Sequence, residues 1–190
     1  MARLRRTRAL ERRRADAQAS AEAGLERRGG PGDSLTDFDL QMMERAMRLA
    51  RQAASEGEVP IAAVVYRGAE VLAEAHNRRE FHADPTGHAE VLALREAGRR
   101  LNAWRLQGCT LAVTLEPCAM CAGALVNARV DRLVYGAADP KAGACESLYE
   151  IATDQRLNHR LVVHRGVYAR GCARLLRNFF AARRLEGRRR

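Results

Sequence analysis

Two short segments carry side chains that can bind a metal and move protons. The first is His88-Ala89-Glu90, and the second is Pro117-Cys118-Ala119-Met120-Cys121. Cys118 and Cys121 are three residues apart, so in a first helical turn both sulfurs face the same way. Thiolates near a helix N-terminus are favoured by the helix dipole and are good ligands for zinc. With His88, three protein ligands leave a fourth position for water, which is typical of a catalytic zinc ion.

Glu90 supplies the group that such a zinc site needs for hydrolysis. Zinc lowers the pKa of a bound water to about 7. A carboxylate beside that water can take its proton and later deliver it to the substrate. Because Glu90 is two residues from His88, it can reach the water without occupying the metal. We therefore predict that Glu90 is the catalytic residue.

Two other interpretations of the cysteines remain open. The chain has five cysteines and no sign of secretion, which favours metal or redox chemistry over a disulfide framework. Cys118 and Cys121 could form a redox pair, although no thioredoxin-like context surrounds them. A structural zinc site would need a fourth donor and would leave Glu90 unexplained. The candidates for that donor are Cys145, Cys109 and His82.

Both segments are expected where a strand ends and a helix begins. The predicted helices cover residues 36–57, 87–101, 118–127 and 146–152, and a last helix contains residues 172–180. The predicted strands cover residues 59–66, 71–76, 111–115, 132–137 and 161–164. After the opening hairpin, strands alternate with helices, which indicates an α/β sheet covered on both faces. In such sheets the carboxyl ends of strands form the binding crevice, so the two segments should meet there.

Several residues are expected to begin these helices or to pack them. Thr36 should cap the first helix, with Asp39 in a capping-box position, and Thr86 should cap the second. Pro117 suits the first turn of the third helix, and Trp104 is expected to pack. One stripe of the last helix should dock on the body; its residues are Cys172, Leu175, Leu176, Phe179 and Phe180.

The net charge of +10 is concentrated at the two ends of the chain. Residues 1–36 hold nine Arg and five acidic residues, and residues 170–190 hold eight Arg and one Glu. Residues 37–169 are nearly neutral, with 16 basic and 17 acidic residues. Basic ends attract phosphate backbones, so nucleic acid is an expected partner. Because 32 of the 33 basic residues are Arg, a GC-rich genome could also explain the charge.

The sequence predicts one folded domain preceded by an arm. Residues 1–34 are rich in Arg and Ala and end in a Gly-Gly-Pro-Gly break, so we predict an arm that is disordered or folds on a partner. Residues 35–190 should form the domain, including the basic C-terminal helix. No run of 18 apolar residues predicts a membrane span, and no apolar stretch follows the basic start. We expect a cytoplasmic protein.

The chain resembles the cytidine and deoxycytidylate deaminase superfamily, and within it the bacterial tRNA-specific adenosine deaminases. The H-x-E segment with a downstream P-C-x-x-C is the recorded signature of zinc-dependent nucleobase deaminases. The resemblance covers roughly residues 37–185. It rests on residues 58–64, Asn77-Arg78, residues 84–90 and 114–124, Gly136-Ala137, Asp139, Lys141, Gly143, Asn158-His159-Arg160 and Phe179-Phe180.

The resemblance implies a three-layer α/β/α fold with a five-stranded mixed sheet, and a homodimer with one zinc ion per subunit. It implies hydrolytic conversion of adenosine to inosine at the wobble position of a tRNA anticodon, in an arginine tRNA. In that picture His88, Cys118 and Cys121 hold zinc and Glu90 shuttles protons. Asn77 contacts the flipped-out nucleoside, and the pair Asp139 and Lys141 lies near the anticodon loop.

Two alternatives to a tRNA enzyme remain. The same zinc chemistry could act on a free base or nucleoside of the guanine or cytosine type. Small substrates need no Arg-rich extension, so the basic final helix favours tRNA. The chain could also be a zinc-stabilised RNA-binding module without turnover, but a purely structural site has no use for the carboxylate of Glu90.

Overall fold

The computed structural model describes residues 34–187. Except for Ser34, the predicted arm lies outside these residues, so the division at residue 34 stays a prediction. The last three arginines also lie outside them. The helices are α2 (Asp37–Ser55), α3 (Arg79–His82), α4 (Ala89–Leu101), α5 (Ala119–Asn127), α6 (Ala169–Gly187) and the 3-10 helix η2 (Ile151–Thr153). The strands are β1 (Ala62–Arg67), β2 (Glu70–His76), β3 (Thr110–Leu115), β4 (Arg132–Ala137) and β5 (Val162–His164). No helix among the described residues is long and apolar enough to cross a membrane.

The five strands form one mixed sheet in the order β2-β1-β3-β4-β5. Strand β1 is antiparallel to both of its neighbours, whereas β3, β4 and β5 are parallel to one another. Strands β2, β3 and β4 therefore point the same way, and their carboxyl ends share one edge with the start of β1. We call this the carboxyl edge of the sheet. The predicted five-stranded mixed sheet is confirmed.

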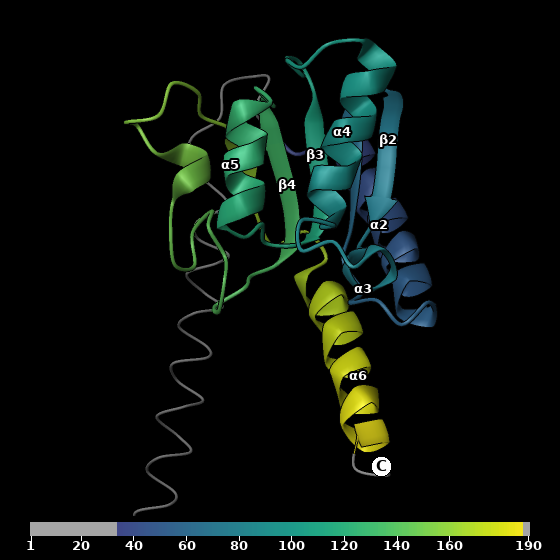
Figure 1. Cartoon of the computed structure of the whole chain (residues 1–190). Helices are drawn as coiled ribbons and strands as arrows, with labels where there is room; N and C mark the ends of the chain where they lie inside the picture. The colour runs from purple at the N-terminus through teal and green to yellow at the C-terminus, as the bar shows by residue number, and fades with distance from the viewer. Residues whose placement is uncertain (1–33, 188–190) are drawn as a thin grey trace, which may run out of the picture. The chain divides into compact units, whose positions relative to one another are not determined.

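Helices cover both faces of the sheet, as the sequence predicted (Figure 1). Alternate residues of β1 separate the two cores, because successive side chains of a strand point to opposite faces. Ala63 and Val65 pack in the core beneath α4 and α5. Val64 and Tyr66 pack in the core beneath α2 and the first turns of α6. The chain therefore forms three layers, with the sheet in the middle.

Helix α2 begins at a capping box that also anchors a buried charge. Thr36 and Asp39 make the predicted reciprocal bonds, with Asp39 N–H to Thr36 Oγ1 at 3.1 Å and Thr36 N–H to Asp39 Oδ2 at 2.7 Å. The carboxylate of Asp39, fully buried, also accepts bonds from the Tyr66 hydroxyl and from Arg132, whose Nη2 lies 2.8 Å from Oδ2. Burial by itself would raise the pKa of Asp39, but the bonds from Arg132, Tyr66 and Thr36 lower it to about 2.

We expect Asp39→Asn to lower the free energy of unfolding by about 3 kcal/mol at pH 7, because it leaves Arg132 partly buried without its counter-charge. The folded-state pKa of Asp39 lies below the ordinary value of 3.8. Its stabilisation is therefore complete above about pH 4 and is lost as pH falls through 2. Urea unfolding of both proteins from pH 7 to pH 2 should show the difference shrinking at the acid end.

Glu74→Gln is the control for that measurement. It breaks the exposed pair between Arg45 and Glu74, which should contribute less than about 1 kcal/mol. If the two substitutions lowered the free energy of unfolding by the same amount, the stabilising role of the buried Asp39 pair would be contradicted.

Three local predictions were wrong. Helix α4 has His88 rather than Thr86 as its N-cap, because the Thr86 hydroxyl and N–H both donate to Asp84 Oδ1, at 2.7 and 2.8 Å. Pro117 precedes the N-cap of α5 instead of occupying its first turn. Trp104 is 61% exposed, with the Arg105 guanidinium carbon 4.1 Å from the ring centroid.

Element boundaries also differ in small ways. The sequence placed a helix at residues 146–152, where the structure has only the three-residue η2. It did not predict the single-turn α3, and it began the first strand at residue 59 instead of 62. Each of these segments is too short for a period of side chains to be recognised.

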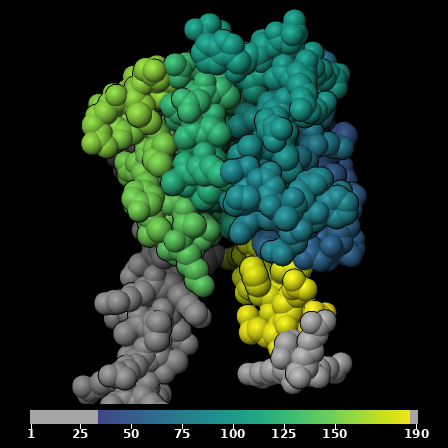
Figure 2. Space-filling view, in the orientation of Figure 1, coloured from purple at the N-terminus to yellow at the C-terminus, as the bar shows by residue number. Residues whose placement is uncertain are grey.

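Helix α6 docks on the sheet through its first turns only. Cys172 is buried, and Gly171 approaches Met47 so closely that a Cβ would lie 2.8 Å from the Met47 methyl carbon. Leu175, Leu176 and Phe179 of the predicted stripe are half-buried, while Phe180 is 45% exposed. Figure 2 shows α6, in yellow, protruding from the rest of the domain. The later turns of α6 are therefore available to bind a partner.

Candidate active site

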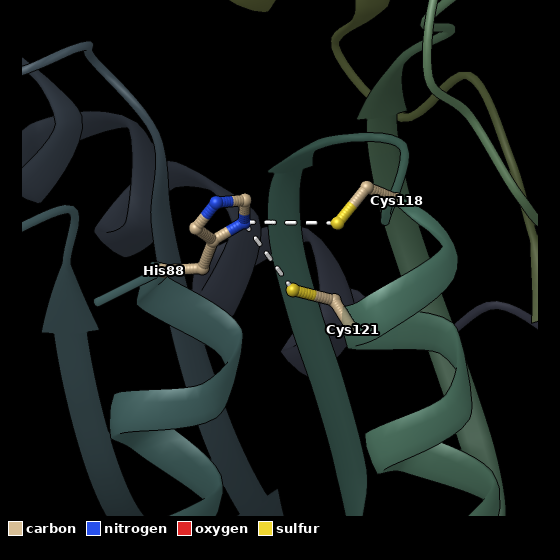
Figure 3. A group of neighbouring side chains, drawn as sticks. All are labelled: His88, Cys118 and Cys121. Carbon is tan, nitrogen blue, oxygen red and sulfur yellow. Dashed lines mark hydrogen bonds between the residues drawn. The ribbon is translucent and has the colours of Figure 1, made fainter. Parts of the chain in front are cut away.

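His88 and Cys118 occupy equivalent places at the starts of two helices. His88 is the N-cap of α4 and Cys118 is the N-cap of α5, both with extended backbone and neither with a side-chain cap hydrogen bond. Cys121 lies in the first turn of α5. Figure 3 shows the three side chains converging between the two helices.

The three donor atoms are spaced as a tetrahedral metal ion requires. His88 Nδ1 lies 3.7 Å from Cys118 Sγ and 3.5 Å from Cys121 Sγ. Ligands at about 2.3 Å for sulfur and about 2.0 Å for nitrogen would put N and S about 3.5 Å apart around one ion. Within the described residues this group of donors contains these three side chains alone. Three protein donors are the number found in catalytic rather than structural zinc sites.

The site favours the thiolate form of Cys118, whereas the hydrogen bond with Cys118 and burial raise the pKa of the Cys121 thiol. Hydrogen bonds with Cys121 and His88 lower the pKa of the Cys118 thiol to about 3, so its sulfur is a thiolate at neutral pH. The start of α5 adds the positive end of a helix dipole beside the same sulfur. Both cysteines are free thiols rather than a disulfide.

Glu90 lies in the first turn of α4 with a buried and incompletely paired carboxylate. Its side chain is 4% exposed, and Oε2 has no hydrogen-bond partner among the described residues. Burial raises the pKa of Glu90, because the charged form is deprived of water. A buried acceptor without a partner is costly, so its presence beside the donor group points to a reacting molecule as its partner.

Asn77 follows β2 at the carboxyl edge of the sheet. It is 3% exposed, and its N–H donates to the Ile61 carbonyl at 2.9 Å. Its side-chain Oδ1 is buried and has no hydrogen-bond partner among the described residues. Asn77 thus offers a fixed amide at the same edge as the donor group.

Asp139 and Lys141 lie in the loop that follows β4 at this edge. Asp139 Oδ1 accepts the N–H groups of Lys141 and Ala142 at 3.0 and 3.3 Å, so this side chain organises its own turn. Lys141 is exposed. The loop is tied to the start of α5 by a β-bridge between Cys118 and Gly143. Both residues are therefore close in the fold to the donor group, on its α5 side.

The loop is held by Glu116, a residue that sequence reasoning did not single out. Its Oε1 accepts the N–H groups of Cys145, Glu146 and Ser147 at 3.2, 2.9 and 2.9 Å. Its Oε2 accepts the Asp139 N–H at 2.9 Å and the Ser147 hydroxyl. The signal in the sequence was an acidic residue at the end of a buried strand, two positions before Cys118.

Gly143 is required where the loop passes Glu116. A Cβ at this position would lie 2.4 Å from the Glu116 carboxyl carbon and 2.6 Å from the Asp139 carbonyl oxygen. Both distances are far below a van der Waals contact. The glycine therefore lets the loop close over the carboxylate and reach Cys118.

Comparison with known proteins identifies the family of this chain. The profile of the MafB19-like deaminases matches residues 38–184. The tRNA-specific adenosine deaminase of Bacillus subtilis is 45% identical over 146 residues, which are 77% of this chain and 90% of that protein. The tRNA-specific adenosine deaminase of Haemophilus influenzae is 43% identical over 152 residues, 80% of this chain and 88% of that protein.

Two solved structures are also similar to this chain. One, from a study of A-to-I editing by tRNA:A34 deaminases at the wobble position of transfer RNA, is 42% identical with a TM-score of 0.69; the match covers 72% of this chain and 99% of that one. A guanine deaminase from Bacillus subtilis is 31% identical with a TM-score of 0.51, over 57% of this chain and 80% of that one. The chain therefore belongs to the MafB19-like deaminases, and among them to the group of the tRNA-specific adenosine deaminases.

Proposed function

We propose that this protein deaminates adenosine to inosine at the wobble position of a tRNA anticodon, in an arginine tRNA. The observation that carries the proposal is the three-donor group of His88, Cys118 and Cys121 beside the buried, unpaired Oε2 of Glu90. It is supported by relatives at 43–45% identity that are tRNA-specific adenosine deaminases.

The metal in this proposal is one zinc ion per subunit, held by His88, Cys118 and Cys121. Two sulfurs and one imidazole are a donor set that zinc accepts readily. When bound, zinc supplies the Lewis acidity that activates water at neutral pH.

Glu90 moves the protons of the reaction. Its Oε2 accepts a proton from the attacking water and passes it to the ring nitrogen N1 of adenine. A bond forms between the water oxygen and C6, and the bond between C6 and the exocyclic nitrogen then breaks. Glu90 then takes the remaining proton from the new hydroxyl on C6 and delivers it to the departing amine, which leaves as ammonia, and C6 becomes the carbonyl carbon of inosine. Asn77 holds the nucleoside through its buried amide, and Asp139 and Lys141 contact the anticodon loop.

The charge of α6 supports an RNA substrate. Five of its arginines are exposed, on a helix that protrudes from the domain (Figure 2); they are Arg170, Arg174, Arg177, Arg183 and Arg184. Such a helix attracts a phosphate backbone. A tRNA substrate also places the protein in the cytoplasm, where tRNA functions.

The alternative is a deaminase of a free base or nucleoside. The likeness to a guanine deaminase at 31% identity favours it. That likeness covers less of this chain, at a lower TM-score, than the likeness to the tRNA:A34 deaminase structure.

We further propose a homodimer in which a second copy of this chain covers a groove between α4 and α5. The groove has a volume of about 770 Å³ and is mostly apolar, with the exposed Trp104 at its side. Apolar surface with an exposed aromatic residue is typical of interface cores. Light scattering should give twice the chain mass of 21.1 kDa.

The test of the function is inosine formation in an arginine tRNA anticodon stem-loop with a wobble adenosine, measured beside free adenosine, guanine and cytidine. Inosine in the stem-loop alone would support the proposal. Ammonia release from a small base or nucleoside, with no reaction of the stem-loop, would show that the proposed substrate is wrong. It would still support zinc-dependent deamination as the reaction.

Loss of the metal should be separable from loss of the fold. We expect Cys118→Ala to abolish both zinc binding and turnover, since it removes one of three donors, whereas Cys109→Ala should keep both. Cys109 is buried, whereas Cys118 is half-buried, and Cys109 lies immediately before β3, at the opposite edge of the sheet. Elemental analysis and turnover of both variants check this. Stoichiometric zinc in Cys118→Ala would remove that residue from the site.

A further inference from the structure

Phe81 is the most exposed large apolar side chain among the described residues, at 71%. It lies in the single-turn α3, between Asn77 and His88 in the chain. A lone exposed apolar residue is common, so exposure alone decides nothing. The surroundings of this ring are what distinguish it.

The turn that carries Phe81 is held by buried and internal bonds. The Phe81 N–H donates to Oε1 of Glu58 at 2.9 Å, and Glu58 is only 1% exposed. The Arg78 N–H, at the start of the turn, donates to the Gly87 carbonyl at 2.9 Å. A buried carboxylate thus fixes the backbone under an exposed ring. The backbone that carries the ring is therefore held in place.

The ring is also bordered by a guanidinium group and an imidazole ring. The Arg78 guanidinium carbon lies 5.0 Å from its centroid, and the His82 ring meets it edge to face at 5.0 Å. Arg78 is paired with Glu56. Arg79 is exposed and makes no ion pair among the described residues. The exposed ring of Phe81 and Arg79, which has no ion pair among the described residues, therefore lie in the same short segment.

This cluster lies at the same edge of the sheet as the proposed active site. Glu58 precedes β1 and Asn77 follows β2, so both lie at the carboxyl edge of the sheet, where Cys118 follows β3. Figure 1 shows α3 at the same end of the sheet as the first turns of α4 and α5. A nucleic acid strand that delivers a base to Glu90 must pass this edge.

We propose that Phe81 is a stacking platform for an unpaired nucleobase that flanks the target adenosine, with Arg79 contacting the adjoining phosphate. This rests on the proposed function and adds a subsite to it. Single-stranded RNA loops are recognised by stacking on aromatic rings together with arginine contacts to the backbone. The flat, exposed ring, carried on a held backbone, matches the face of a base, and a base in an anticodon loop is free to leave its stack.

The test compares Phe81→Ala, Phe81→Leu and Phe81→Tyr with the wild type. Binding of a labelled anticodon stem-loop is measured by anisotropy, and inosine formation is measured on the same RNA. Stacking of one base contributes about 1–3 kcal/mol, so we expect Ala and Leu to weaken binding about 5- to 100-fold. Tyr keeps a ring and should bind within about twofold of the wild type. Zinc content and melting temperature should not change, since the side chain is exposed.

Further RNAs identify which flanking base stacks on Phe81. In stem-loops with an abasic site on one side of the target adenosine, the Ala variant should bind like the wild type once the stacked base is missing. Equal binding by Leu and wild type, or an unchanged defect on both abasic RNAs, would overturn the platform. If the wild type binds the stem-loop but forms no inosine, the proposed function fails while the binding data still decide on Phe81. If it does not bind the stem-loop, both fail.

Discussion

Glu90→Gln should keep its metal and lose turnover by at least about 10²- to 10⁴-fold, the range that general acid–base groups contribute. The amide has nearly the same shape as the carboxylate but cannot accept the proton of the attacking water. Because the change also removes a buried carboxylate with an unpaired oxygen, the variant should melt at or above the wild-type temperature. Turnover, zinc content and melting temperature should be measured on the same preparation.

Glu96→Gln is the matched control, because Glu96 lies on the same helix with its side chain 58% exposed. It should leave all three quantities unchanged. A metal-loaded Glu90→Gln protein with turnover within tenfold of the wild type would remove Glu90 from the chemistry. A large fall in its melting temperature would instead show that the carboxylate is structural.

Glu116→Gln should lower the free energy of unfolding by about 2–4 kcal/mol and reduce turnover on the stem-loop. The carboxylate accepts five donors, of which four are backbone N–H groups. Glutamine has one acceptor oxygen and turns an NH₂ group towards the remaining donors, each of which costs about 1–3 kcal/mol when left buried without a partner. The loop that carries Asp139 and Lys141 should loosen as a result.

Urea unfolding and steady-state kinetics measure the two effects. The control is Glu150→Gln, an exposed change after the same loop. If the role of Glu116 is to position the loop, the KM for the stem-loop should rise while zinc stays bound. An unfolding free energy within about 0.5 kcal/mol of the wild type would contradict the role that its hydrogen bonds indicate.

The meeting of His88 with Cys118 and Cys121 could be anticipated because it follows from topology. Each segment follows a strand, and parallel strands end at a common edge. The fold class followed from the same alternation of strands and helices. The capping box of Thr36 and Asp39 was also predictable, since it depends on residues three apart.

The features that the sequence did not predict depend on contacts between distant parts of the chain or on competition between local hydrogen bonds. Glu116 bonds residues 23 to 31 positions away, and no local pattern specifies such partners. Thr86 was a reasonable N-cap by residue type, but its competing bonds to Asp84 place the start of α4 two residues later. Exposure of Trp104 and Phe81 also depends on packing, which amino-acid type alone does not determine.

The two N-caps have a consequence for how stability and function are balanced. Asp, Asn or Ser at the N-cap would stabilise each helix by about 1 kcal/mol over a residue that does not cap. At positions 88 and 118 the chain instead carries His and Cys, whose side chains turn toward each other. We expect substitutions that improve capping at these two positions to abolish metal binding and turnover. Thermostable variants should therefore be sought away from these two positions. At these two positions the side chains are turned to each other, and neither helix has a side-chain cap.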